Sequence, residues 1–159
     1  MREINLTTKI AVYRLEECSE VEKKLIDAAK SATQKAYAPY SRFRVGAAVL
    51  LENGEIISAN NQENAAYPSG LCAERTALFF ANATYPDQKV EAIAVAAWHN
   101  GQFTHDVITP CGACRQVLLE AENRFHAPIK VLMLGGEGIY VVTAIKDLLP
   151  LSFGDEMLK

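Results

Sequence analysis

The chain has 159 residues and half of them are hydrophobic, which excludes a disordered protein and fits a single domain over residues 1–159. Its sixteen basic residues are scattered and outnumbered by nineteen acidic ones, giving a net charge of −3. Nucleic-acid binders usually carry a basic face, so this balance argues against a nucleic-acid partner and favours a small neutral ligand. The N-terminus lacks the apolar core of a signal peptide, and no apolar run reaches the length of a membrane span. We therefore expect a cytoplasmic protein without a membrane partner.

The first predicted elements are a strand and a helix. Residues 8–15 fit a short edge strand. Ser19 and Glu22 have the spacing of a capping box, and apolar residues at helical spacing follow them. This helix should end before Pro39, because the residue before a proline avoids the helical region.

A β-hairpin is predicted next. Two strand-like runs, 45–51 and 55–59, flank Asn53-Gly54, which is the strongest short signal for a hairpin. The polar stretch 60–70 that follows is irregular.

The remaining elements alternate between helix and strand. They are a helix from near Cys72, a strand over 90–97, a helix from near Cys111 to about Arg124, strands over 129–134 and 140–143, and a short helix over 145–149. This order predicts an α/β fold with three layers, α/β/α, in which helices cover a mixed, roughly five-stranded sheet.

Four cysteines in a reducing compartment are not expected to form disulfides, and three of them lie in two short segments that each open a predicted helix. Cys111 and Cys114 are three residues apart, which places both sulfurs on one side of a helical turn, as two thiolates on one zinc ion require. Helix N-termini also favour thiolates over thiols. Alone, this pair also fits a redox motif, half of a structural zinc site or buried thiols.

Counting ligands separates a structural zinc site from a catalytic one. Cys72, Cys111 and Cys114 supply three ligands, and a catalytic zinc keeps three protein ligands with water at the fourth position. Four other side chains could close the site, but sequence distance or polar, loop-like surroundings argue against them. They are Cys18 and the histidines His99, His105 and His126, which we interpret as solvated loop residues.

Glu74 lies two residues after Cys72, so its carboxylate can reach water on the zinc ion without being a ligand. It is therefore the expected proton shuttle, with zinc-bound water as the nucleophile. A ligand followed by x-Glu and then by Pro-Cys-x-x-Cys is the signature of zinc deaminases. Arg75 would offset the negative charge of three thiolates by hydrogen bonding to a ligand sulfur; the alternative is a solvated helix arginine.

Five motifs follow Ala36: YAPYSRFRVGAA at 37–48, NQENAAYP at 61–68, CAERTA at 72–77, PCGACRQ at 110–116 and LLPLSFG at 148–154. In these motifs the chain from Ala36 onward resembles the small, homotetrameric type of cytidine deaminase. The resemblance implies a cytidine deaminase-like fold with one zinc ion per subunit. It also implies hydrolysis of cytidine and deoxycytidine to uridine and deoxyuridine plus ammonia, in pyrimidine salvage.

The resemblance also implies roles for substrate-binding residues. Asn61 and Glu63 would hold the ribose hydroxyls and Phe43 would pack on the base and sugar, although a turn residue and core packing are plainer interpretations of Asn61 and Phe43. The main-chain amide of Ala73 would bind the base carbonyl, and the carbonyl of Thr109 would accept from the departing amino group.

Three further positions match residues that line a neighbouring subunit's site in the family, so the site would be complete only in a homotetramer. They are Ala65, Tyr67 and Phe153; packing on its own subunit is the alternative for Phe153. Arg44 departs from the family's more usual proline or other residue after the phenylalanine, and the first seventeen residues have no assigned role.

Three other functions remain open. A deaminase of the same fold could act on another amino-pyrimidine nucleoside such as blasticidin S, although Asn61 and Glu63 favour plain ribose or deoxyribose. A zinc-stabilised binding module would have no use for Glu74. A polynucleotide editor is disfavoured by the charge and by the residues that would enclose the ribose.

Overall fold

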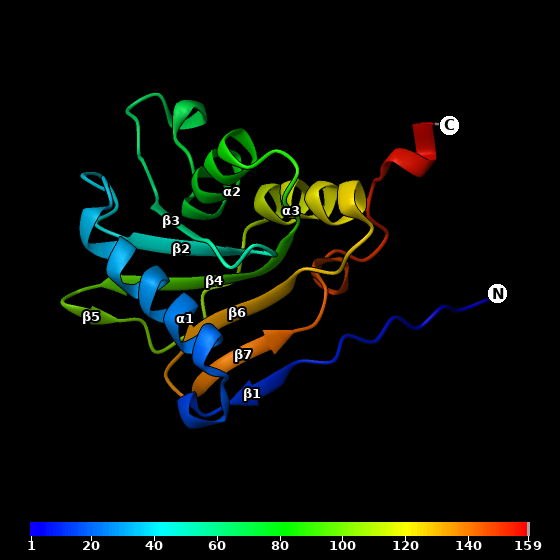
Figure 1. The fold of residues 1–159 in the computed structure, drawn as a ribbon, viewed down its shortest axis with the longest axis horizontal. Helices are drawn as coiled ribbons and strands as arrows, with labels where there is room; N and C mark the ends of the chain where they lie inside the picture. Colours follow the sequence, from blue (N-terminus) through cyan, green and yellow to red (C-terminus); the bar gives the residue numbers. More distant parts are fainter. Residues whose placement is uncertain (159) are drawn as a thin grey trace.

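A seven-stranded mixed sheet forms the middle layer in the computed structural model, which describes residues 1–158 (Figure 1). The strand order is β1-β7-β6-β4-β2-β3, with β5 paired to β4; β4 and β6 are parallel and the other pairs antiparallel. The strands are β1 (Ala11–Tyr13), β2 (Arg44–Leu51), β3 (Ile56–Asn60), β4 (Val90–His99), β5 (Gln102–Phe103), β6 (Lys130–Gly135) and β7 (Gly138–Val142). The sheet exceeds the roughly five strands expected because two very short strands also pair with it: β1, which lies within the edge strand predicted over 8–15, and β5, which the sequence pattern does not predict.

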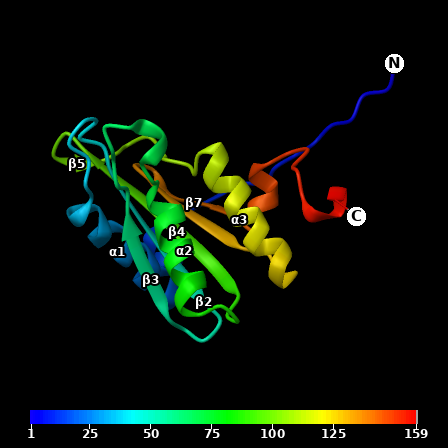
Figure 2. The same cartoon turned by 90° about the horizontal axis from the view of Figure 1, so that it is seen from above.

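Helices cover both faces of the sheet, which confirms the three-layer α/β/α prediction. Figure 2 shows α1 (Glu20–Ala32) on one side of the sheet, and α2 (Ala73–Thr84) and α3 (Gly112–Phe125) on the other. Five 3₁₀ turns complete the described chain: η1 (Leu15–Glu17), η2 (Thr33–Lys35), η3 (Tyr67–Ser69), η4 (Ile145–Leu148) and η5 (Asp155–Leu158). None of the helices formed by residues 1–158 has the length and apolarity to cross a membrane.

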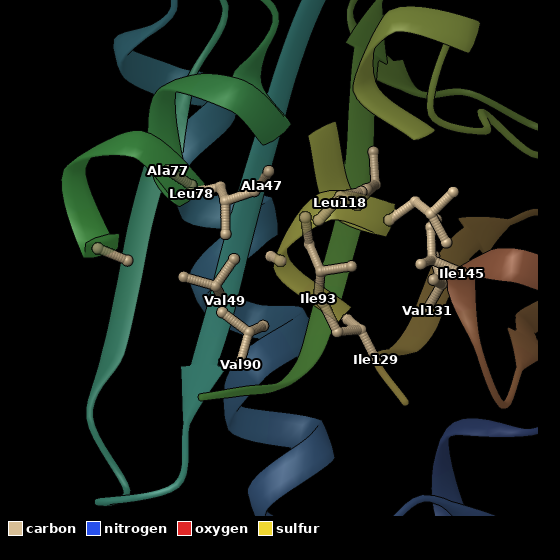
Figure 3. Close-up of a cluster of buried hydrophobic side chains, with 14 of the residues drawn as sticks. Ala47, Val49, Ala77, Leu78, Val90, Ile93, Leu118, Ile129, Val131 and Ile145 are labelled. Carbon is tan, nitrogen blue, oxygen red and sulfur yellow. The ribbon is translucent and has the colours of Figure 1, made fainter. Parts of the chain in front are cut away.

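Alternation along the central strands divides the core into two clusters. The odd-numbered Ala47 and Val49 of β2 and Ile93 of β4 pack under α2 and α3, where Figure 3 shows them with Leu78 and Leu118. Ala48 and Leu50 of β2 and Ala92, Ala94 and Ala96 of β4 pack under α1. Successive strand side chains point to opposite faces, so parity separates the two clusters along these stretches. Val90 is an exception, because the register shifts beside it and its side chain joins the cluster under α2 and α3.

Helix α1 begins as its sequence predicts. The Ser19 hydroxyl accepts a hydrogen bond from the main-chain N–H of Glu22 (3.3 Å), and the Glu22 carboxylate accepts one from the N–H of Ser19 (2.8 Å). The helix then crosses β2 at Gly46, where a Cβ atom would lie 2.0 Å from the carbonyl oxygen of Ala29. Only glycine permits this close approach.

The direction of the strands brings two helix N-termini together. Both β3 and β4 run antiparallel to β2, so they are parallel to each other and end at the same edge of the sheet. Helix α2 is the next α-helix after β3, and helix α3 is the next one after β4 and the short β5. Their N-cap residues, Cys72 and Cys111, lie side by side, so both helices begin near this edge, which is where ligands usually bind in α/β sheets.

Candidate active site

Three cysteine sulfurs meet where α2 and α3 begin. Cys72 is the N-cap of α2, Cys111 is the N-cap of α3, and Cys114 lies in the first turn of α3. The Sγ atoms of Cys72 and Cys111 are 3.9 Å apart, those of Cys111 and Cys114 are 3.5 Å apart, and all three lie within 4.8 Å of one another. Cys18 is buried against α1 on the other side of the sheet, and it is absent from this cluster.

This donor set fits zinc. Thiolates at about 2.3 Å from one tetrahedral ion would have sulfurs about 3.8 Å apart, close to the separations between neighbouring sulfurs seen here. A hydrogen bond from Cys114, assisted by Arg75, lowers the pKa of Cys72 to about 5. The same bond and burial raise the pKa of Cys114. Three sulfurs so close together cannot all be thiolates unless a cation neutralises them, and a cation at their centre meets that need.

Glu74 lies in the same helical turn as Cys72 and only 5% of its surface is exposed. This burial raises the pKa of its carboxyl group above the ordinary value, and the negative charge of Cys72 acts in the same direction. A buried carboxyl group beside a metal-binding cluster, with no lysine or arginine salt bridge in the described chain, is placed for proton transfer better than for stabilising the fold.

The guanidinium group of Arg75 lies beside the sulfur cluster. Its Nη2 lies 3.8 Å from the Sγ of Cys72, as expected of an arginine that donates to a ligand sulfur. The pKa of Arg75 is raised, first by this hydrogen bond. Its Nε is buried without a hydrogen-bond partner in the described chain, so the side chain also holds a spare donor.

A cavity of about 470 Å³ opens beside the cluster. It is lined by Tyr40, Ser41, Asn61, Gln62, Glu63, Asn64, Tyr67, Gly70, Leu71, Cys72 and Arg75. Cavities of this size accept small molecules. Four of the predicted residues thus share one cavity with a predicted zinc ligand: Asn61, Glu63, Tyr67 and Arg75.

Asn61 and Glu63 both organise the loop that precedes β2. Asn61 accepts from the N–H of Val45 (2.8 Å) and donates to the carbonyl of Phe43 (2.9 Å). The carboxylate of Glu63 accepts from the main-chain N–H groups of Tyr40 (2.9 Å) and Ser41 (3.3 Å) and from the Ser41 hydroxyl, and this last bond lowers the pKa of Glu63. Asn61 is therefore more than a turn residue, because its side chain also holds the main chain of Phe43 and Val45.

Phe43 is half-buried, and it is not among the residues that line the cavity. Its ring packs on His99, with ring centroids 5.5 Å apart. The prediction that His99 is a solvated loop residue is therefore wrong: it ends β4, is half-buried and bonds to the carbonyl of Arg42. Strand β4 ends at His99, two residues beyond the end of the apolar run 90–97. His105 and His126 are exposed.

The other predicted residues fall into two groups. Ala73 is fully buried at the start of α2, and Thr109 is exposed just before α3. Ala65 and Tyr67 are exposed, Tyr67 at 79%, and Phe153 is 55% exposed with its carbonyl held by Gln116. On a single chain Tyr67 lines the cavity beside Cys72, whereas Ala65 and Phe153 do not line it.

Arg115 is a site residue that the sequence reasoning missed. Its guanidinium donates to the carbonyls of Pro110 (2.7 Å) and Leu148 (2.7 Å) and to the Thr109 hydroxyl (3.1 Å). It thereby ties the segment before Cys111 to the C-terminal part of the chain. The available signal was an arginine in a first helical turn with no acidic residue three or four positions away to pair with.

Comparisons with known proteins agree with this geometry. The family model for the cytidine and deoxycytidylate deaminase zinc-binding region matches residues 19–126, which include the three cysteines, Glu74 and Arg75. A cytidine deaminase of Sporosarcina psychrophila is 42% identical over 135 residues, covering 85% of this chain and 93% of the relative.

Solved structures match over a similar extent. The cytidine deaminase of Burkholderia pseudomallei superposes with a TM-score of 0.70 at 45% identity, covering 82% of this chain and 97% of the other. That of Mycobacterium tuberculosis superposes with a TM-score of 0.66 at 33% identity, covering 84% of this chain and 97% of the other.

Proposed function

The chain belongs to the cytidine and deoxycytidylate deaminase family, and from that premise we propose that it hydrolyses cytidine and deoxycytidine to uridine and deoxyuridine with release of ammonia. The observation that carries this proposal is the meeting of three cysteine sulfurs near the buried Glu74 carboxyl, beside a cavity of about 470 Å³ that Cys72 lines. In this role the enzyme is a cytoplasmic one of pyrimidine salvage, built as a single domain over residues 1–159.

The metal centre uses one zinc ion per subunit. Cys72, Cys111 and Cys114 would hold the ion, because they supply three soft ligands and leave a fourth position open. When bound, zinc supplies the Lewis acidity that makes water nucleophilic near neutral pH. Glu74 takes a proton from the attacking water and delivers it to the substrate, and the bond between the ring carbon and the amino nitrogen breaks to release ammonia. Arg75 offsets part of the thiolate charge by donating to Cys72.

Substrate binding uses the loop and cavity beside the cluster. Asn61 and Glu63 bind the ribose hydroxyls: each carboxylate or amide oxygen has more than one acceptor site, so a hydroxyl can join the bonds these groups already make to the loop. Phe43 packs on the base and sugar. The amide of Ala73 binds the base carbonyl, and the carbonyl of Thr109 accepts from the departing amino group.

A homotetramer with shared sites accounts for the exposed residues of the motifs. Ala65, Tyr67 and Phe153 would contact the nucleoside bound to a neighbouring subunit. Tyr67 and Phe153 are large and mostly exposed on a single chain, which supports contacts beyond it.

The direct test is an assay of the zinc-loaded protein with cytidine, in which turnover is measured as the loss of the cytidine absorbance band. We expect turnover that a zinc chelator abolishes and that added zinc restores, because removing the ion removes the Lewis acid. Blasticidin S, assayed in parallel, separates the two substrate classes. Faster turnover of the antibiotic than of cytidine, or turnover that survives complete removal of zinc, would reject the proposal.

The role of Arg75 is tested by Arg75→Gln, which removes the charge but keeps a donor. We expect zinc affinity to fall by about 10-fold, the lower range for partners of metal ligands, measured by competition with a chromogenic chelator. Arg124→Gln is the matched control, because Arg124 is an exposed helical arginine that donates to the carbonyl of Pro86. If zinc affinity and the pH–rate profile are the same in both variants, Arg75 has no such role.

A further inference from the structure

Phe43 lies directly before β2, close to His99, the last residue of β4. The antiparallel register pairs Val45 with Ala97 and Arg44 with Trp98, so Phe43 and His99 stand at the next position. Both carry odd numbers, so alternation places them on the face of Val45 and Val95, which belong to the cluster under α2 and α3. Trp98 points to the other face, where its ring packs on Phe103. The strand register alone therefore brings the imidazole ring to Phe43.

His99 makes two contacts with this loop. Its ring lies 5.5 Å from the Phe43 ring, centroid to centroid, and is tilted by 45°. Its Nδ1 lies 3.2 Å from the carbonyl oxygen of Arg42. A carbonyl oxygen can only accept a hydrogen bond, so Nδ1 of His99 carries a hydrogen and donates a hydrogen bond to the carbonyl of Arg42. One side chain thus holds both the backbone before Phe43 and the face of its ring.

The backbone that His99 holds is in an unfavourable conformation. Arg42 has φ = +56°, in the left-handed region that L-residues with long side chains rarely adopt. Its N–H donates to the carbonyl of Ala38 (3.0 Å), and its carbonyl accepts from His99. Such a conformation persists only where the surroundings over-determine it, and these two bonds fix Arg42 on both sides.

Three side chains from two parts of the chain anchor residues 38–43. Glu63 binds the N–H groups of Tyr40 and Ser41, and Asn61 binds the carbonyl of Phe43. These two anchors come from the segment after β3, and His99 supplies the third from the end of β4. Without His99, the Arg42–Phe43 peptide would have no anchor from β4.

We propose that His99 is a positioning residue for substrate recognition, which holds Phe43 in the orientation that packs on the bound nucleoside. The inference rests on the proposed function, because it takes Phe43 as the nucleoside-packing side chain. A loop that is ordered before binding spares the substrate the cost of ordering it. The contacts of His99 in the described chain are with Arg42 and Phe43 and not with the sulfur cluster or Glu74, so we expect its effect on KM and not on kcat.

Three substitutions separate the two contacts. His99→Asn keeps a donor at the place of Nδ1 and removes the ring, His99→Phe keeps the ring and removes the donor, and His99→Ala removes both. We expect KM for cytidine to rise about tenfold in His99→Ala and about threefold in each partial variant, with kcat within about twofold of the unmodified enzyme. His126→Asn is the control, because His126 is an exposed cap of α3 with φ = +50°, where asparagine is well tolerated.

A second measurement does not depend on turnover. Amide hydrogen exchange at Ser41 and Phe43 is expected to accelerate in His99→Ala and to stay unchanged in the control. Unchanged KM, a fall in kcat alone, or unchanged loop exchange would each overturn the inference. If the unmodified zinc-loaded protein fails to turn over cytidine, the proposed function fails, and exchange still reports whether His99 anchors the loop.

Discussion

Replacing Glu74 by glutamine is expected to leave the zinc content unchanged and to lower turnover of cytidine by at least ~10²–10⁴, the contribution of a general acid–base group. Glutamine has nearly the same shape, so it fits the buried position, but it cannot take a proton from water. The measurements are kcat by loss of the cytidine absorbance band and zinc content by metal analysis of the same sample.

Glu91→Gln is the matched control for this experiment, because Glu91 is exposed on β4 and lies outside the cavity. It should keep both zinc and turnover. If Glu74→Gln turns over cytidine at the rate of the unmodified enzyme, the proposed proton shuttle is wrong. If it loses zinc, Glu74 contributes to the metal centre itself and the three-ligand assignment is wrong.

The sequence predicts the elements that carry the site well, because local signals define them. The capping box at Ser19 and the apolar run of β4 depend on neighbouring residues alone, and both are confirmed. Helices are predicted to begin near Cys72 and near Cys111, and both predictions are confirmed. Helices α2 and α3 begin side by side because of the order and direction of the strands that precede them. The sequence predicts that helices and strands alternate, but it does not predict the order of the strands in the sheet.

The interpretations that failed depend on long-range pairing. Strand β5 has two residues, so it has no periodicity to detect, and it exists because it pairs with the end of β4. His99 looks solvated in a polar stretch, and only the register of β2 with β4 brings it to Phe43. Arg115 reaches Leu148, thirty-three residues away, through a contact that no local pattern encodes. Non-local contacts of this kind also explain why substrate roles rest on resemblance more than on spacing.

Cys114 and Cys18 offer the sharpest test of the ligand count, because both are buried, at 0% and 4% exposure, and neither forms a disulfide. Cys114→Ala is expected to lose zinc, since two thiolates bind the ion far more weakly than three. Turnover should fall by at least ~10³, which corresponds to losing the several kcal/mol of charge stabilisation that a metal ion supplies. Cys18→Ala removes an equal volume of side chain from the core under α1, so it should lose stability and keep both zinc and turnover.

The two variants together separate loss of metal from loss of packing. Zinc content, kcat and melting temperature are measured for each, and added zinc is not expected to rescue Cys114→Ala because the ligand itself is missing. Full zinc content in Cys114→Ala would mean that Cys114 is not a ligand, and the site would then lack the three-sulfur set on which the reaction class depends. If Cys18→Ala loses zinc while it keeps its fold, Cys18 would be a fourth zinc ligand. A closed four-cysteine site is structural, and Glu74 would then have no water to activate.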